Sequence, residues 1–352
     1  MRKLSKMMVF ILILALLVPI AIGCQPTEES SGGEEASTDT ITIGVSLPTQ
    51  REERWVRDKE AMEKWAETYG VDIKVQVADA DQAQQAQQVE NLLTQGIDVL
   101  ILAPHNASAS VELVRKAKEE NVPVLSYDRL VTATDQLDYY ISFDNEAVGR
   151  LQGQYFIDNV EKGNVMLFAG APTDNNALLF FKGAMEKLQP KIDSGDYTVL
   201  GGEEFQQVAT DNWVPANAQN RATNILTANP DAEIAGVLAP NDGTAGGIIE
   251  AFKASGVDLP IVTGQDSEIA AIKRIQIGEQ SMTIFKDTRE LAKSAIESSI
   301  KIASNEDVAT NGVVDNGSIE VPSILLEPKV VTQDNFQALL VDSGYIQASD
   351  IE

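Results

Sequence analysis

From residue 41 onward, apolar segments of two kinds alternate along the chain. Short runs rich in β-branched residues, such as ITIGVSLP (41–48), DVLILAP (98–104) and VPVLSYDR (122–129), are typical of strands buried on both faces. Longer segments with helical periodicity lie between them, for example QAQQAQQVENLLTQG, which ends at Gly96. A regular series of this kind indicates parallel strands with helices on both faces of the sheet. The sequence therefore predicts an α/β fold.

The series is interrupted once, by the short predicted strand YYISFDN (139–145), and then restarts with the helix-like segment EAVGRLQGQYFIDNV. With 352 residues, the chain is long enough for two domains. We therefore expect two doubly wound lobes, with the break near residue 145. No repeat of 20–50 residues is visible, which argues against a solenoid.

Composition excludes several classes of function. The chain has 53 acidic and 27 basic residues, a net charge of −26, which repels the phosphates of nucleic acids. One Cys cannot form an intrachain disulfide or a Cys-cluster metal site, and one His, His105, cannot build a His-rich one. No dinucleotide-binding, zinc-protease or EF-hand motif is found. We expect no metal and no cofactor.

The N-terminus is predicted to be a targeting segment. Basic residues precede an apolar run (7–22) that is too short for a typical membrane span and typical of a signal peptide. The Gly before Cys24 resembles the bacterial lipoprotein signal, which implies a signal peptide over 1–23 and a lipid on Cys24. Residues 24–40 are acidic and contain no large apolar side chain, so we expect a flexible tether. The body would then be held outside the cytoplasm at a membrane surface.

Polar side chains follow most of the predicted strands. Ligands of open α/β sheets bind beyond the carboxyl ends of the strands, which makes these side chains candidates for a binding site. They have two possible roles, because Asp, Asn and Ser at such ends also cap the next helix. The set comprises 51–55, His105, Asn106, Asp128, Arg129, Asp174, Asn175, Asn176, Asn241, Asp242, Gln265, Asp266, Lys286 and Asp287, with Trp213 in a loop before a helix.

The residue types in this set suit the recognition of a sugar. Carboxylate and amide oxygens accept hydrogen bonds from hydroxyl groups, and Arg and Lys donate to them. An indole can stack on the apolar face of a pyranose ring, although each Trp could equally be a packing anchor. The set contains no nucleophile–base pair built on His or Cys, which argues against an enzyme.

Several segments resemble one family over about residues 41–350. These are IGVSLPTQREERW, VLSYDRL, YYISFDNEAVG, GAPTDNNA, DNWVPANA, APNDGTAGG and TGQDSEIAAIKRI. They resemble the pocket motifs of type I periplasmic binding proteins for monosaccharides, which feed ABC transporters, and most of all the xylose-binding members. The resemblance implies two Rossmann-like lobes joined by a three-strand hinge. The N-terminal lobe would comprise 41–145 and about 286–321, and the C-terminal lobe 146–285 and about 322–352, with crossings after Phe285 and near Pro322.

The resemblance also implies a role for each site residue. Arg54, Asp128 and Arg129 would reach the sugar from the first lobe, and Trp55 and Trp213 would sandwich its ring. Asp174, Asn176, Asn241 and Asp266 would bind hydroxyls from the second lobe, and Lys286 would donate near the hinge.

The expected function is capture of a monosaccharide, D-xylose first, by a monomeric protein that delivers it to a membrane permease. The segment TIFKDTRELAK (283–293) is more similar to binding proteins for several sugars, such as glucose, galactose and arabinose. A second alternative is a receptor that presents the sugar to a membrane sensor kinase. A third is a glycoside hydrolase using two of the carboxylates, against which the two-lobe pattern argues.

Overall fold

The structure is a computed structural model that describes residues 40–352. The predicted signal peptide (1–23), the predicted lipidation site Cys24 and nearly all of the predicted tether (24–40) lie outside these residues. Within residues 40–352, no helix is both long and apolar enough to cross a membrane.

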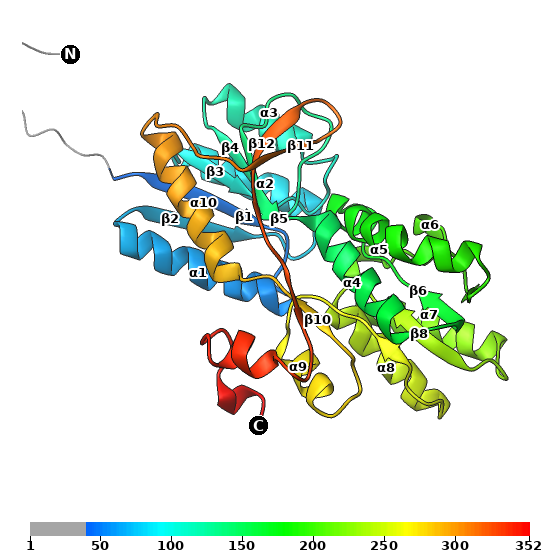
Figure 1. Ribbon diagram of the computed structural model, residues 1–352. Coiled ribbons are helices and arrows are strands. Elements are labelled where there is room, and N and C mark those ends of the chain that lie inside the picture. Colours follow the sequence, from blue (N-terminus) through cyan, green and yellow to red (C-terminus); the bar gives the residue numbers. More distant parts are fainter. Residues whose placement is uncertain (1–39) are drawn as a thin grey trace, which may run out of the picture. The chain divides into compact units, whose positions relative to one another are not determined.

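The first lobe is built on a seven-stranded sheet (Figure 1). Its strands are parallel except β11, which pairs antiparallel with β12 at one edge. In spatial order they are β11 (Gly312–Asp315), β12 (Glu320–Leu326), β5 (Tyr139–Phe143), β4 (Val124–Tyr127), β3 (Val99–Leu102), β1 (Thr42–Leu47) and β2 (Asp72–Val77).

Helices cover both faces of this sheet. Helices α1 (Glu53–Tyr69) and α10 (Thr288–Ala303) pack on one face, and α2 (Gln82–Thr94) and α3 (Val111–Glu119) on the other. The side chains of β3 alternate between the two layers: Ile101 packs with α1 and α10, and Leu100 and Leu102 with α2 and α3. Burial on both faces explains why the strands read as continuous apolar runs.

The second lobe repeats this design on a smaller sheet. Its strand order is β7 (Tyr197–Leu200), β6 (Gly163–Leu167), β8 (Ile234–Leu238) and β9 (Ile261–Val262), all parallel. Helices α4 (Asn145–Asn159) and α5 (Asn175–Asp193) cover one face, and α7 (Pro215–Ala228) and α8 (Asp242–Ser255) the other. The predicted α/β fold with two doubly wound lobes is confirmed.

Helices α4 and α5 pack unusually close because glycines lie at their contact. A Cβ atom on Gly149 would stand 2.0 Å from the carbonyl oxygen of Phe180, and one on Gly183 would stand 2.2 Å from that of Glu146. Such distances do not occur between real atoms without backbone movement, so both positions require glycine. The close packing fixes α5, and with it the position of Phe180 at the edge of the binding cavity described below.

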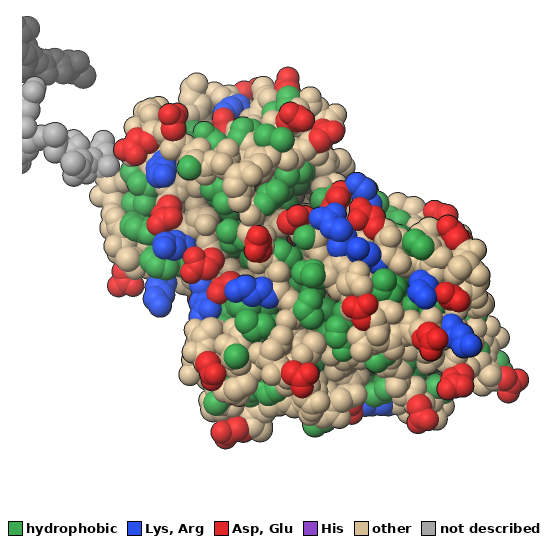
Figure 2. Space-filling view, in the orientation of Figure 1, with side chains coloured by type: hydrophobic (Ala, Val, Ile, Leu, Met, Phe, Trp, Pro, Cys, Tyr) green, Lys and Arg blue, Asp and Glu red, His purple; other side chains and the backbone are tan. Residues whose placement is uncertain are grey.

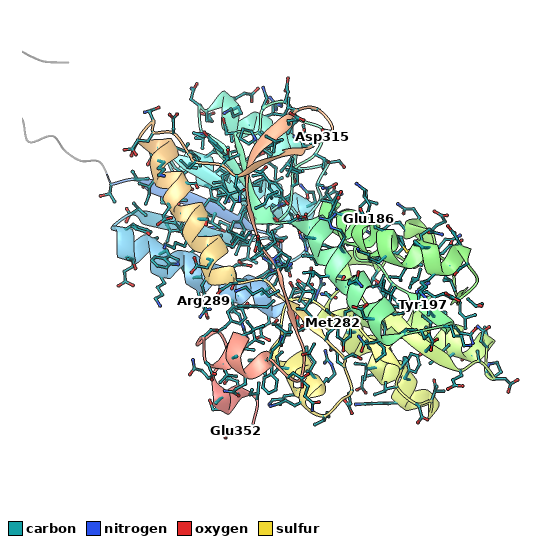
Figure 3. All side chains as sticks on the ribbon, in the orientation of Figure 1. Glu186, Tyr197, Met282, Arg289, Asp315 and Glu352 are labelled. Carbon is teal, nitrogen blue, oxygen red and sulfur yellow. The ribbon has the colours of Figure 1, made fainter. Side chains whose placement is uncertain are left out.

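Three segments join the lobes. The chain first crosses between β5 and α4, and it returns between β10 (Thr283–Phe285) and α10. Figure 3 labels Met282 and Arg289 on either side of this return. The last crossing precedes β13 (Lys329–Val331), which pairs antiparallel with β10. The first sheet continues through β12 to Leu326, so this crossing lies beyond the predicted Pro322. Pro322 pairs with Val313 of β11, and pairing with β5 begins at Ser323.

The chain ends in a segment packed beside α9 (Ile269–Gln276), shown in red in Figure 1. It contains a π-helical turn (Gln337–Val341) and a 3₁₀ turn (Ala348–Asp350), and α6 (Phe205–Val208) and a 3₁₀ turn (Asp211–Trp213) complete the second lobe. Tyr345 packs against Phe285 with ring centroids 4.7 Å apart. Acidic and basic side chains are interspersed on the face shown in Figure 2.

Candidate binding site between the lobes

One cavity, with an empty volume of about 320 Å³, is lined by residues of both lobes. All ten predicted site residues line it: Arg54, Trp55, Asp128, Arg129, Asp174, Asn176, Trp213, Asn241, Asp266 and Lys286. They meet because both sheets direct the carboxyl ends of their strands toward it.

Helix starts supply much of the lining. Asp174 is the N-cap of α5 and accepts a hydrogen bond from the backbone N–H of Asn176. Asn241 is the N-cap of α8 and accepts one from the N–H of Thr244. Both residues also face the cavity. Capping and lining are therefore combined in the same side chains.

The charged centre of the cavity is Arg54, which is 5% exposed. Its guanidinium lies 3.0 Å from Asp58 and 2.7 Å from Asp128 in the first lobe, and 3.8 Å from Asp266 in the second. Burial alone would lower the pKa of Arg54, but the carboxylates of Asp128, Asp58 and Asp266 raise it well above its ordinary value. Arg54 is thus a permanent buried cation.

Asp128 is the counterpart of this cation. Burial alone would raise its pKa, but Arg54, Lys286 and Arg129 lower it below its ordinary value. Its backbone carbonyl accepts hydrogen bonds from Tyr140, Ser142 and Asn176, at 2.7, 2.7 and 2.8 Å. The carboxylate is therefore ionised and its backbone held by both lobes.

A second ion pair crosses between the lobes. Nε of Arg129 lies 2.9 Å from Oδ2 of Asp174, and the same oxygen accepts a hydrogen bond of 3.1 Å from the indole N–H of Trp213. Burial raises the pKa of Asp174, although Arg129 acts in the opposite direction. This pair orients both the Arg129 guanidinium and the Trp213 indole at the cavity wall.

The two tryptophans are held by different contacts. Trp55 is 1% exposed, with the guanidinium carbons of Arg54 and Arg129 at 4.6 and 5.3 Å from its ring centroid. Trp213 lies against Gly170, where a Cβ would stand 2.0 Å from Cη2. Only glycine allows the indole to approach the backbone this closely.

Three lining residues have strained backbones. The φ angles of Asp128, Asp266 and Trp213 are +56°, +95° and +57°. L-residues seldom adopt such angles, and residues that do are concentrated at functional sites. Here these backbone conformations direct two carboxylates and one indole into the same cavity.

Several buried oxygen atoms in the lining accept no hydrogen bond from the residues that the structure describes. They are Oδ2 of Asp128, Oδ1 of Asp266, Oε1 of Gln265 and Oε2 of Glu52. The first two nevertheless lie close to a cation: Oδ2 of Asp128 is 2.7 Å from Arg54, and Oδ1 of Asp266 is 2.9 Å from Lys286. Buried acceptors are normally hydrogen-bonded, so Oε1 of Gln265 and Oε2 of Glu52 are the lining atoms best suited to accept hydrogen bonds from a ligand.

Comparison with known proteins accounts for this architecture. Residues 43–307 match the model of the periplasmic binding protein domain. The chain belongs to this family. It is 38% identical to the D-xylose-binding periplasmic protein of Escherichia coli (90% of this chain, 94% of the relative). It is 39% identical to the multiple sugar-binding periplasmic receptor ChvE of Rhizobium radiobacter, at the same coverages.

A solved structure of the family agrees closely with this one. It is an ABC transporter solute-binding protein from Clostridium phytofermentans with bound β-D-glucose. Its TM-score is 0.86 at 37% identity, covering 88% of this chain and all of that one. The family's members named here are binding proteins, and periplasmic binding proteins work outside the cytoplasm.

The structure adds residues to the predicted site and leaves others out. Glu52, Phe180 and Gln265 also line the cavity. Glu52 and Gln265 belong to the set of polar residues that follow the strands. Phe180 lies within α5, and a residue inside a helix cannot be found by looking at the ends of strands. The other strand-end candidates, which do not line this cavity, are Arg51, Glu53, His105, Asn106, Asn175, Asp242 and Asp287. Among residues 40–352, no cluster of His, Cys, Asp or Glu is arranged to hold a metal ion.

Three carboxyl groups near the cavity predict a dependence of stability on pH. Burial raises the pKa of Asp58 to about 6, of Asp242 to about 7 and of Glu268 to about 8. The folded state therefore holds protons that the unfolded state releases near pH 4, and stability falls as pH rises through these values. We expect the melting temperature to be higher at pH 5.5 than at pH 8.

Asp242→Asn should reduce the difference in the free energy of unfolding between pH 5.5 and pH 8 by on the order of 1–2 kcal/mol. The substitution removes one of the three carboxyl groups that hold a proton in the folded state. Glu112→Gln is the control, since Arg115 lowers the pKa of this exposed carboxyl and it stays ionised throughout the range. Thermal denaturation across pH 5.5–8 measures both. A stability that rises with pH in the wild type would contradict the prediction.

Proposed function

We propose that the protein is an extracytoplasmic solute-binding protein that captures a monosaccharide in its pyranose form between the two lobes. D-xylose is the first candidate, and the captured sugar is delivered to an ABC permease. The relatives support this class of ligand, since they bind D-xylose or multiple sugars by name.

One observation carries the proposal. Two indoles and a set of buried carboxylates, amides and cations from both lobes line a single cavity. Flat aromatic faces suit the C–H faces of a pyranose, and charged acceptors and donors suit its hydroxyls.

The energetics require nearly complete enclosure of the sugar. A micromolar Kd corresponds to about −8 kcal/mol, or roughly −0.8 kcal/mol for each of the ~10 heavy atoms of a pentose. This is about half of the highest ligand efficiency known, roughly −1.5 kcal/mol per atom. Residues of both lobes must therefore contact the sugar at once.

Closure of the two lobes around the sugar is supported by oppositely charged side chains that meet across them. Arg54 approaches Asp266, and Arg129 pairs with Asp174. In both cases the first lobe supplies the cation and the second lobe the carboxylate. A sugar bound among these groups contacts both lobes only when they are together. Its affinity for the closed form then shifts the equilibrium toward closure.

Titration calorimetry of the purified protein with D-xylose, D-glucose, L-arabinose and D-ribose tests the proposal. We expect micromolar or tighter binding of D-xylose. Comparable binding of D-glucose, which differs by one CH₂OH group, would assign the protein to the multiple-sugar class. Heat with none of the four sugars would contradict the assignment of the ligand.

Trp213→Ala should weaken sugar binding by about 10- to 100-fold, because it removes one apolar wall worth roughly 1.5–3 kcal/mol. Trp65→Ala is a matched control. This half-buried indole stacks on Tyr69 of the same helix, outside the cavity, so its loss affects stability and leaves affinity unchanged. Equal affinities of the two variants would remove Trp213 from the site.

The proposal includes a lipid anchor at Cys24, which rests on the basic and apolar segments before this residue and the acidic tether after it. In cells supplied with a labelled fatty acid, the wild type should incorporate the label and Cys24→Ser should not. An unlabelled wild type would show that the protein has no such anchor.

A further inference from the structure

We propose that Arg51 and Glu52 form a latch at the edge of the cavity. Glu52 accepts a hydrogen bond from a hydroxyl of the bound sugar, and Arg51, held by the same carboxylate, fastens the loop of Trp213 on the opposite lobe. This inference rests on the proposed function and extends it to two residues that are not among the ten predicted site residues.

Glu52 has a buried oxygen that is free to bind a ligand. The residue is the N-cap of α1 by position, but its side chain makes no capping hydrogen bond. It is 9% exposed and lines the cavity. Its Oε2 atom accepts no hydrogen bond from any residue within 40–352. A buried carboxylate oxygen is a strong acceptor that is costly to leave unpaired, so a sugar hydroxyl is its natural partner.

The other oxygen of Glu52 is committed to Arg51. Oε1 accepts hydrogen bonds from Nε and NH2 of Arg51, at 3.0 and 2.6 Å. The backbone N–H of Arg51 also donates to Oγ1 of Thr49, at 3.1 Å, which fixes the start of the side chain. The guanidinium therefore has a defined direction even though it is 38% exposed.

Arg51 then reaches the second lobe. Its NH2 group donates a hydrogen bond to the backbone carbonyl of Asn212. Asn212 and Trp213 both have left-handed backbones, with φ of +51° and +57°. A hydrogen bond to this carbonyl stabilises the turn that places the Trp213 indole in the cavity.

The two halves of the latch share one carboxylate, which links binding to closure. A sugar held by Oε2 keeps Glu52 in place, and Glu52 keeps Arg51 aimed at Asn212. Opening of the lobes must break the contact between Arg51 and Asn212. The latch should therefore act mainly on the rate at which the sugar leaves.

Stopped-flow tryptophan fluorescence of the full chain tests this, using the sugar that the wild type binds most tightly among the four above. We expect Arg51→Ala to raise the dissociation rate about 3- to 10-fold and to change the association rate less than twofold. Glu52→Ala should weaken affinity about 10- to 100-fold, as for a hydrogen bond to a charged group. The double variant should be little worse than Glu52→Ala, because the two residues act together.

Arg115→Ala is the matched control, since Arg115 is also an exposed Arg paired with glutamates of its own helix, α3, and does not line the cavity. It should leave both rates unchanged. Dissociation rates of Arg51→Ala and Glu52→Ala equal to that of the wild type would overturn the latch.

Monodeoxy analogues of the same sugar test the direct contact of Glu52. One analogue should bind the wild type more weakly than the parent sugar, yet bind Glu52→Ala as well as the parent does. If every analogue loses as much affinity in Glu52→Ala as in the wild type, Glu52 touches no hydroxyl. A wild type that binds none of the four sugars would instead refute the proposed function, and the latch with it.

Discussion

The rest of the site depends on the pairing of the buried Arg54 guanidinium with the carboxylates around it. The guanidinium lies among carboxylates of Asp58 and Asp128 in its own lobe and near Asp266 in the other. Burying one cation and three carboxylates is costly unless they are paired closely, and removing one partner leaves the others uncompensated. Asp58 is further held by a hydrogen bond from the Tyr127 hydroxyl. The geometry of the cavity therefore follows from the way these charges satisfy one another.

Backbone features support this cluster from outside. The unusual φ angles of Asp128 and Asp266 direct their carboxylates inward, and the close approach of α4 and α5 at Gly149 and Gly183 sets the wall that Phe180 provides. Nζ of Lys286 lies 5.4 Å from the Phe180 ring centroid and 2.9 Å from Asp266, so this wall and the charges are connected. A small backbone shift at either glycine would therefore move Phe180 and change the geometry of the site.

Much of the site was predictable because parallel strands bring their carboxyl ends to one edge. Asp128 follows β4, Asp266 follows β9 and Lys286 follows β10, and this order is visible in the printed sequence. Phe180 was not predictable in this way, because it lies on a helix and reaches the cavity only through helix packing. The first sheet continues past Pro322 to Leu326, because Pro322 is tolerated within β12 where it pairs with β11.

The sequence by itself determined the alternating α/β architecture, the two lobes and the set of polar residues from which the site is drawn. It could do so because apolar periodicity and strand-end position are local properties of the chain. Only the tertiary structure decided which side chains pair, as Arg54 does with Asp266 and Arg129 with Asp174, and which oxygens, such as Oε2 of Glu52, are left to a ligand. Charge pairing and burial depend on distances in space between residues far apart in the chain, and the fold alone sets those distances.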